Sequence, residues 1–381
     1  MLDRETNELL CQVGPGTPMG ELLRRYWMPI GPVAEVDEME KRPVRLLGEN
    51  LLVFKDRQGR YGLLAEECSH RGASLCYGKV EQDGIRCPYH GWKYDVNGNC
   101  LEQPAEPPEA SSKNNIKHRA YSVQGLGGLL FGYLGPAPAP LLPRYDVLVK
   151  EDYARQIEIR PVHECNWLQP MENTIDPAHF YWLHAYTGGF QRNGRDDLED
   201  ERFEVETFEY GIYKYHHRPN TIEVHPLVFP NIRRGPQNAI HFYIPMDDTH
   251  TGVISVKYSR VQGAGPPEQI AVPYKYLPPI KEVHNDNGFP RYKYHMKTIP
   301  DQDGMAWETQ GRMADRTREH LVSSDKGLVM FRQILRLQIE AVKKGQDPLG
   351  VVRDPAKNGI IEFKVGEIDR VTGKQINQFR D

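Results

Sequence analysis

The stretch from Cys68 to Trp92, CSHRGASLCYGKVEQDGIRCPYHGW, contains two pairs of metal-ligating side chains. Cys68 and His70 form the first pair, Cys87 and His90 form the second, and sixteen residues separate His70 from Cys87. Two thiolates and two imidazoles can hold either a Zn ion or a [2Fe–2S] centre in which the cysteines bind one iron and the histidines the other. The stretch therefore predicts a metal centre with these four ligands.

The distribution of the ligands favours the cluster over zinc. A structural zinc site usually draws two cysteines from one loop, whereas here each loop contributes one cysteine and one histidine. This division suits a diamond-shaped cluster, because each loop must then reach both irons. Gly72 and Gly91 permit the tight turns that such loops need. The pattern CxHRG followed by CPYHGW resembles the signature of Rieske iron–sulfur domains.

Length and composition limit the remaining possibilities. A chain of 381 residues is expected to form two domains. A net charge of −4 gives no sign of nucleic-acid binding. The start MLDRETNELL does not resemble a signal peptide, and the uncharged run 120–143 is interrupted by Gly and Pro, so no membrane span is expected. We therefore expect a cytoplasmic protein, in which the cysteines outside the cluster are free. These cysteines are Cys11, Cys76, Cys100 and Cys165.

The pattern along the chain predicts an α+β protein. Residues 1–40 form an N-terminal segment that packs on the catalytic domain, residues 41–140 form a small antiparallel β domain around the metal centre, and residues 145–381 form a larger catalytic domain. In the larger domain, 164–186 is expected to be mostly helical, 203–260 to form several strands and 312–344 to form a helix. The stretch 266–302 is rich in Pro, Asn and Gly and is expected to form loops or a lid. A central antiparallel sheet flanked by helices follows.

The stretch ENTIDPAHFYWLH contains a second candidate metal site. Non-haem Fe(II) that activates O₂ is commonly held by two histidines and one carboxylate, and His179 and His184 offer the two imidazoles. Residues five apart point about 140° apart on a regular helix. Either the helix is distorted between them, for instance by a π-bulge, or His184 lies just past its end.

Acidic residues complete this second site. Asp301, Asp303 and Glu308 are candidates for the third iron ligand, and Asp303 is our choice. Asp176, followed by Pro177, suits a helix N-cap. It could also accept the outer N–H of a metal-bound histidine and offer a short path to another redox centre.

Together, ENTIDPAHFYWLH, QDGMAWE and the CxHRG/CPYHGW pair resemble the catalytic α-subunit of Rieske non-haem iron oxygenases. Within this family the chain is most similar to the phthalate dioxygenase and dehydrodivanillate O-demethylase branch. The resemblance implies that His179, His184 and Asp303 hold one mononuclear Fe(II), that Asp176 is the carboxylate that bridges to a cluster histidine of the next subunit, and that the catalytic domain has the helix-grip fold. It also implies a head-to-tail ring, a homotrimer or stacked trimers, and leaves open a role for Asn173 near the iron.

The family resemblance implies an O₂-dependent oxidation of an aromatic, carboxylated substrate. Aryl O-demethylation is favoured, and ring cis-dihydroxylation is the alternative. No dinucleotide-binding fingerprint is present, so electrons must come from a separate NAD(P)H-dependent reductase, with or without a ferredoxin. Cations are needed to bind a carboxylate. The candidates are His216, His217, Arg218, Arg233, Arg234 and His241.

A Rieske electron carrier without oxygenase activity is the distant alternative. Such respiratory proteins have a further cysteine in each loop, a membrane anchor, and a serine after the second His-Gly that donates a hydrogen bond to sulfur. This chain has Ala73 and Tyr89 near the cysteine positions and Trp92 at the serine position. Fewer hydrogen bonds to sulfur predict a midpoint potential in the lower part of the Rieske range.

Overall fold

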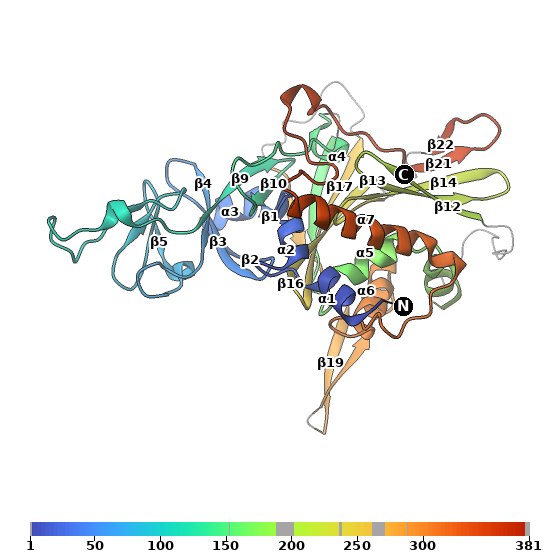
Figure 1. Ribbon diagram of the computed structural model, residues 1–381, viewed down its shortest axis with the longest axis horizontal. Coiled ribbons are helices and arrows are strands. Elements are labelled where there is room, and N and C mark those ends of the chain that lie inside the picture. Colours follow the sequence, from blue (N-terminus) through green and yellow to red (C-terminus); the bar gives the residue numbers. More distant parts are fainter. Residues whose placement is uncertain are drawn as a thin grey trace.

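The computed structural model describes residues 2–151, 153–187, 202–235, 238–260, 271–287 and 289–377. Its long axis runs from a small β-rich part, which contains both cluster loops, to a larger part built on a broad sheet (Figure 1). The two parts are joined by backbone hydrogen bonds from Leu47 N to Pro245 O (2.8 Å) and from Gly48 N to Met246 O (2.9 Å). No helix within the described ranges is long and apolar enough to cross a membrane.

Two antiparallel sheets form the small part. The first has the strand order β1-β10-β9-β4-β3-β2 and the second has the order β5-β6-β7-β8. A separate apolar core, which includes Phe54, Leu75 and Ile85, lies beneath the cluster loops. The strands are β1 (Met28–Pro32), β2 (Lys41–Leu46), β3 (Glu49–Lys55), β4 (Tyr61–Ala65), β5 (Lys79–Val80), β6 (Ile85–Arg86), β7 (Lys93–Tyr94), β8 (Cys100–Glu102), β9 (Ala120–Leu126) and β10 (Leu129–Tyr133).

The N-terminal segment contacts both parts. Its helices α1 (Arg4–Cys11) and α2 (Pro18–Leu23) lie against α7 (Lys326–Lys343), whereas β1 pairs with β10 in the small part. Helix α3 (Val33–Met39) follows β1 directly. The domain limits near 40 and 140 stay a prediction.

A ten-stranded sheet forms the larger part, with the order β12-β13-β14-β15-β16-β17-β11-β18 and with β21 and β22 added beside β14. The β11–β18 pair is parallel and the other pairs are antiparallel. The predicted α+β class with a central antiparallel sheet is confirmed. The strands are β11 (Tyr153–Ile159), β12 (Arg202–Phe208), β13 (Gly211–His217), β14 (Thr221–Val228), β15 (Ile232–Gly235), β16 (Ala239–Asp247), β17 (His250–Arg260), β18 (Tyr274–Tyr276), β21 (Gly366–Asp369) and β22 (Gln375–Asn377).

Helices flank this sheet, and two predicted segments differ from the structure. Besides α7, the helices of the larger part are α4 (Asp146–Val149), α5 (Leu168–Ile175) and α6 (Ile299–Thr309). The predicted helix over 312–344 begins only at Lys326, because backbone groups of the preceding stretch bond to other segments: Asn166 N donates to Arg312 O and Leu2 N to Arg316 O.

The stretch predicted as loops or a lid is largely structured. Residues 261–270 lie outside the described residues, but strands β19 (Lys281–Asp286) and β20 (Phe289–Tyr294) form a hairpin that projects from the molecule (Figure 1). Its turn contains Asn287 at a φ of 50°, a conformation that asparagine tolerates better than most residues. Local turn residues therefore marked the tip of a hairpin rather than an extended loop.

Candidate functional site

The two cluster loops have matching backbone conformations. Gly72 and Gly91 adopt φ values of +73° and +75°, which residues other than glycine rarely adopt. In each loop the glycine N–H donates to the carbonyl of the cysteine four residues earlier, at 2.8 and 3.2 Å. The N–H of each cysteine donates to the carbonyl five residues later, at 2.9 and 2.8 Å. The chain thus presents Cys68 and Cys87 from two similar turns.

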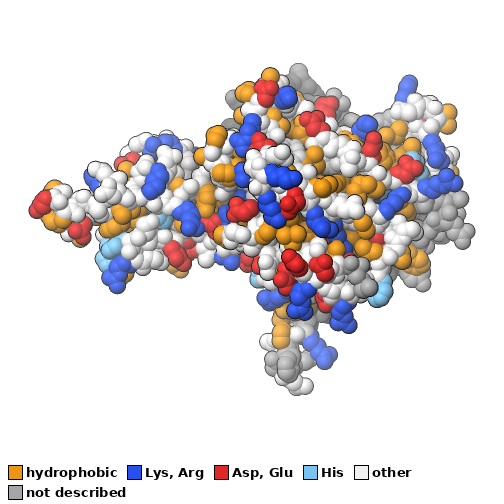
Figure 2. Space-filling view, in the orientation of Figure 1, with side chains coloured by type: hydrophobic (Ala, Val, Ile, Leu, Met, Phe, Trp, Pro, Cys, Tyr) orange, Lys and Arg blue, Asp and Glu red, His pale blue; other side chains and the backbone are white. Residues whose placement is uncertain are grey.

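The side chains of these loops fit a two-iron centre. Cys68 and Cys87 are buried, whereas His70 and His90 are half-buried with their ring centroids 4.6 Å apart. Burial raises the pKa of the Cys68 thiol, and His70 Nδ1 is buried without a hydrogen-bond partner. Figure 2 shows histidine side chains at the surface of this part of the molecule. The four cysteines outside the two cluster loops form no disulfide, as expected.

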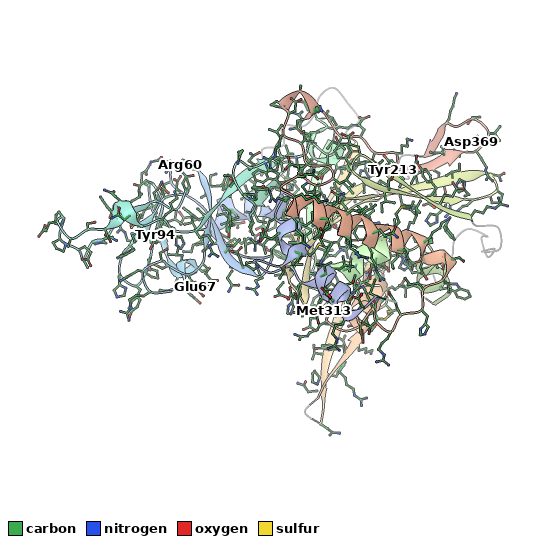
Figure 3. All side chains as sticks on the ribbon, viewed as in Figure 1. Arg60, Glu67, Tyr94, Tyr213, Met313 and Asp369 are labelled. Atoms are coloured by element: carbon green, nitrogen blue, oxygen red, sulfur yellow. The ribbon has the colours of Figure 1, made fainter. Side chains whose placement is uncertain are left out.

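Tyr94 is a cluster-site residue that the motif did not reveal. Its hydroxyl lies 3.2 Å from Cys68 Sγ, and its ring stacks on His118 at 4.6 Å. Figure 3 shows Tyr94 within the small part. His118 is itself held by Ser69 Oγ (2.7 Å) and by Ala65 O (2.9 Å). A tyrosine two residues after Trp92 was the available signal, but only the fold places its hydroxyl at the sulfur.

A π-helix brings the two candidate iron-ligand histidines, His179 and His184, together. Helix α5 ends at Ile175, and a π-helix over Phe180–Thr187 begins directly after His179. Hydrogen bonding from i to i+5 widens each turn, so residues five apart come to the same face. The ring centroids of His179 and His184 lie 5.4 Å apart. Of the two predicted alternatives, the distorted helix is the one observed.

Asp303 lies beside both histidines. Its Oδ1 is 3.3 Å from His184 Nε2 and 3.9 Å from His179 Nε2. One ligand atom from each of the three residues lies within 4.8 Å of the others, and no other such group occurs among the described residues. Burial alone would raise the pKa of Asp303, but the neighbouring His184 and His179 outweigh it and lower that pKa. These donors fit a single Fe(II) ion.

Neighbouring side chains orient the two imidazoles. Gln302 Nε2 donates to Met296 O (3.1 Å), so its Oε1 faces His184 Nδ1 at 2.8 Å. His184 therefore carries its proton on Nδ1 and directs Nε2 toward the ligand group. Asp176 Oδ2 lies 3.3 Å from His179 Nδ1, without the alignment of a full hydrogen bond. Gln302 escaped sequence analysis because an amide carries no metal-ligand signature.

Asp176 and Asn173 connect this group to its surroundings. Asp176 accepts hydrogen bonds from the amides of Ala178 (2.8 Å) and His179 (3.3 Å), as a helix-capping residue does. Its side chain is 26% exposed. Asn173 Nδ2 donates to Asp303 Oδ1 at 3.2 Å. Both residues thus contact side chains of the candidate metal site.

The two other acidic candidates serve elsewhere. Asp301 caps α6, because it exchanges hydrogen bonds with Thr298 in a capping box. Glu308 Oε1 lies 3.1 Å from His163 Nδ1, and its Oε2 pairs with Lys281 (2.5 Å). Neither belongs to the group around the histidines.

A cavity that is partly open to solvent adjoins the three candidate ligands. Two cations line it, Lys214 and Arg233. Its other lining residues are Asn173, Thr174, His179, Phe180, His184, His216, His225, Tyr243, Ile299 and Asp303.

The structure separates the six candidate carboxylate binders. Arg234 pairs with Asp146 in the core, at 3.1 Å, and Arg218 pairs with Glu223 at 2.6 Å. His217 lies 3.1 Å from Glu204 Oε2, and His241 is held by Ser255. Of the six, Arg233 and His216 line the cavity.

Comparisons with known proteins agree with this arrangement. Residues 26–122 match the Rieske [2Fe-2S] domain, and residues 292–371 match the family described as LigXa C-terminal domain like. The chain is 39% identical to the 5,5'-dehydrodivanillate O-demethylase oxygenase subunit of a Sphingobium species, over 97% of this chain and 88% of that protein. It is 32% identical to the phthalate 4,5-dioxygenase oxygenase subunit of Pseudomonas putida, over 96% and 92%.

Solved structures share the fold at lower identity. NdmA of Pseudomonas putida CBB5 superposes with a TM-score of 0.60 at 21% identity, covering 86% of this chain and 94% of that chain. The terminal oxygenase of carbazole 1,9a-dioxygenase from Nocardioides aromaticivorans gives a TM-score of 0.58 at 18% identity, covering 90% and 97%.

Proposed function

Because the chain belongs to the Rieske non-haem iron oxygenases, we propose that it uses O₂ to demethylate a carboxylated aryl methyl ether. The observation that carries the proposal is the cavity that has His179, His184 and Asp303 on one wall and Arg233 among its lining residues. The 39% identical relative is an O-demethylase subunit, which favours this reaction over ring dihydroxylation.

The residues of this chain divide the work as follows. A bound [2Fe–2S] cluster would supply electrons one at a time, and a bound Fe(II) would bind and activate O₂. Arg233 has a guanidinium for which no described residue supplies a carboxylate, so it can pair with the substrate carboxylate through two parallel hydrogen bonds. Gln302 holds His184 in the tautomer that a metal requires.

The net reaction balances with one reduced nicotinamide. An aryl methyl ether, O₂, NADH and a proton give a phenol, formaldehyde, water and NAD⁺. Hydroxylation of the methyl carbon forms a hemiacetal, which breaks its C–O bond to release formaldehyde. Because no dinucleotide fingerprint is present in the sequence, the hydride must be taken up by a separate reductase.

Electron delivery is proposed to occur between subunits. The strands around the cluster loops lie at one end of the molecule, well separated from α5 (Figure 1). Asp176, beside His179, lines a surface depression whose other acidic residues, Glu172, Asp315, Glu319 and Asp325, outnumber its two arginines, Arg316 and Arg332. The cluster loops of another copy carry Arg71, whose guanidinium lies over the Tyr89 ring, and could bring this positive charge to the depression. A head-to-tail ring, as a trimer or stacked trimers, would bring the two sites together.

Turnover with a supplied reductase tests the proposal. Methoxylated and unsubstituted aromatic acids are incubated with the purified oxygenase, and formaldehyde and cis-diols are measured together with O₂ consumption. Formaldehyde in proportion to O₂ supports O-demethylation, whereas diol products identify the alternative. An Arg233→Gln variant should raise KM for the acid by about 10-fold or more, because a charge-assisted pair is lost. Mass photometry reports whether the chain assembles as a ring.

A further inference from the structure

Two adjacent strands supply a polar wall of the iron cavity. Lys214 and His216 are two residues apart on β13, so both side chains point to the same face of the sheet. His225 on β14 is the register partner of Lys214 and joins them on this face. All three line the cavity beside the candidate iron ligands.

His216 is buried without a partner. Its side chain is 3% exposed, and neither ring nitrogen makes a hydrogen bond. Burial and the nearby Lys214 ammonium lower the pKa of His216, so the ring is neutral, with one N–H donor and one acceptor nitrogen. The ring of His225 lies 5.0 Å away but is engaged by Glu223 at 3.3 Å. A buried polar side chain without a partner costs free energy, which a ligand in the cavity can recover.

One of the three N–H donors of Lys214 makes no hydrogen bond to the described residues. Its Nζ donates to Thr174 O and to Asp176 O, both at 2.9 Å, which accounts for two of its three N–H groups. Among the described residues nothing accepts the third. Asp303, the one carboxylate lining the cavity, is already assigned to the metal. Lys214 and Arg233 therefore both line the cavity without an ion-pair partner among the described residues.

We propose that Lys214 and His216 form a second polar subsite, which binds an anionic oxygen of the substrate in addition to the carboxylate held by Arg233. This assignment rests on the proposed function. A phenolate oxygen and a second carboxylate offer the same chemistry, an oxygen that accepts from both the Lys214 ammonium and the His216 N–H. The subsite selects aromatic acids that carry a second acidic group.

Binding measurements test the subsite without turnover. Calorimetric titrations use the iron-loaded oxygenase without O₂ and two matched pairs of acids. One pair is meta-methoxybenzoate with and without a para-hydroxyl group, and the other is phthalate and benzoate. We expect the added group to tighten binding by about 10-fold or more in at least one pair. His216→Phe and Lys214→Met should each reduce that gain to less than about 2-fold.

Controls separate the possible outcomes. Lys257→Gln on β17 removes a half-exposed lysine that pairs with Glu158, outside the cavity, and should keep the full gain. If Lys214→Met does not fold, His216→Phe, which keeps a ring of similar size, still decides. If the added group still tightens binding in His216→Phe, or does not tighten it in the wild type, the subsite is overturned. Binding of the simple acids in either case leaves the proposed function intact. Failure of all four acids to bind the wild type overturns both.

Discussion

Replacing Tyr94 with phenylalanine should lower the midpoint potential of the cluster. The Tyr94 hydroxyl lies 3.2 Å from Cys68 Sγ in a buried position. Burial and the Cys68 sulfur raise the pKa of Tyr94, so its hydroxyl stays protonated and donates a hydrogen bond to the sulfur. The reduced cluster carries one more negative charge than the oxidised cluster, so the donor stabilises the reduced state more.

The size of the shift follows from hydrogen-bond energetics. A hydrogen bond to a charged group contributes about 1.5–3 kcal/mol. Because the sulfur is already negative in the oxidised state, we take the difference between the two redox states as about 1 kcal/mol. A factor of ten corresponds to about 1.4 kcal/mol, or about 59 mV for one electron, so Tyr94→Phe should shift the potential by about −40 mV.

A redox titration followed by electron paramagnetic resonance measures this shift. Cluster content, from iron and sulfide analysis, should be the same in both proteins. Tyr133→Phe is the matched control, because Tyr133 is also buried in the small part but its hydroxyl donates to Pro136 O. A shift of less than about 10 mV, or a shift to higher potential, would refute the role of the Tyr94 hydroxyl.

Four further predictions concern the iron site and its surroundings. Asp176→Asn should leave iron and cluster content unchanged but reduce turnover by about 100-fold, and normal turnover would contradict the bridge. Asp303→Ala should lose mononuclear iron while the visible spectrum of the cluster survives; retained iron would require another ligand. Gln302→Leu should weaken Fe(II) binding by about 10- to 100-fold in a titration, because His184 loses its orienting partner. Burial acts against ionisation of Glu308, but His163 and Lys281 outweigh it and lower its pKa from 4.5 to about 2. Its contribution to stability is therefore present above pH 4.5 and lost as the pH falls toward 2, so Glu308→Gln should flatten the fall of Tm over this range.

The low midpoint potential of the cluster was predicted from Trp92, and the structure adds Tyr94 as a second residue that affects it. Trp92 stands where respiratory Rieske proteins have serine, and it stacks on His70 at 4.5 Å. One hydroxyl donor to sulfur is therefore absent, but Tyr94 supplies another. The prediction of a potential in the lower part of the Rieske range stays, with Tyr94 as the reason it should not reach the lowest values.

Local chemistry made the candidate ligand residues identifiable from the sequence alone. Metal ligands must be Cys, His or a carboxylate, and loops that hold them need glycines at set distances, so Cys68, His70, Cys87 and His90 are evident as a spaced motif. Strand β12 was likewise predictable, because its side chains alternate between the two faces of the sheet and leave a period of two along the chain.

Tertiary structure alone decided which side chains act on those ligands. Tyr94 reaches Cys68 across 26 residues and Gln302 reaches His184 across 118 residues. Tyrosine, glutamine and lysine serve many roles, so nothing in their local sequence marks them, and only packing places Lys214 beneath the end of α5. The π-helix also depended on tertiary structure. The spacing of His179 and His184 required a distortion of the helix, but the contacts around it decided the form of that distortion. Ligand identity is a property of residue type and spacing, whereas orientation and charge balance are properties of neighbours brought together by the fold.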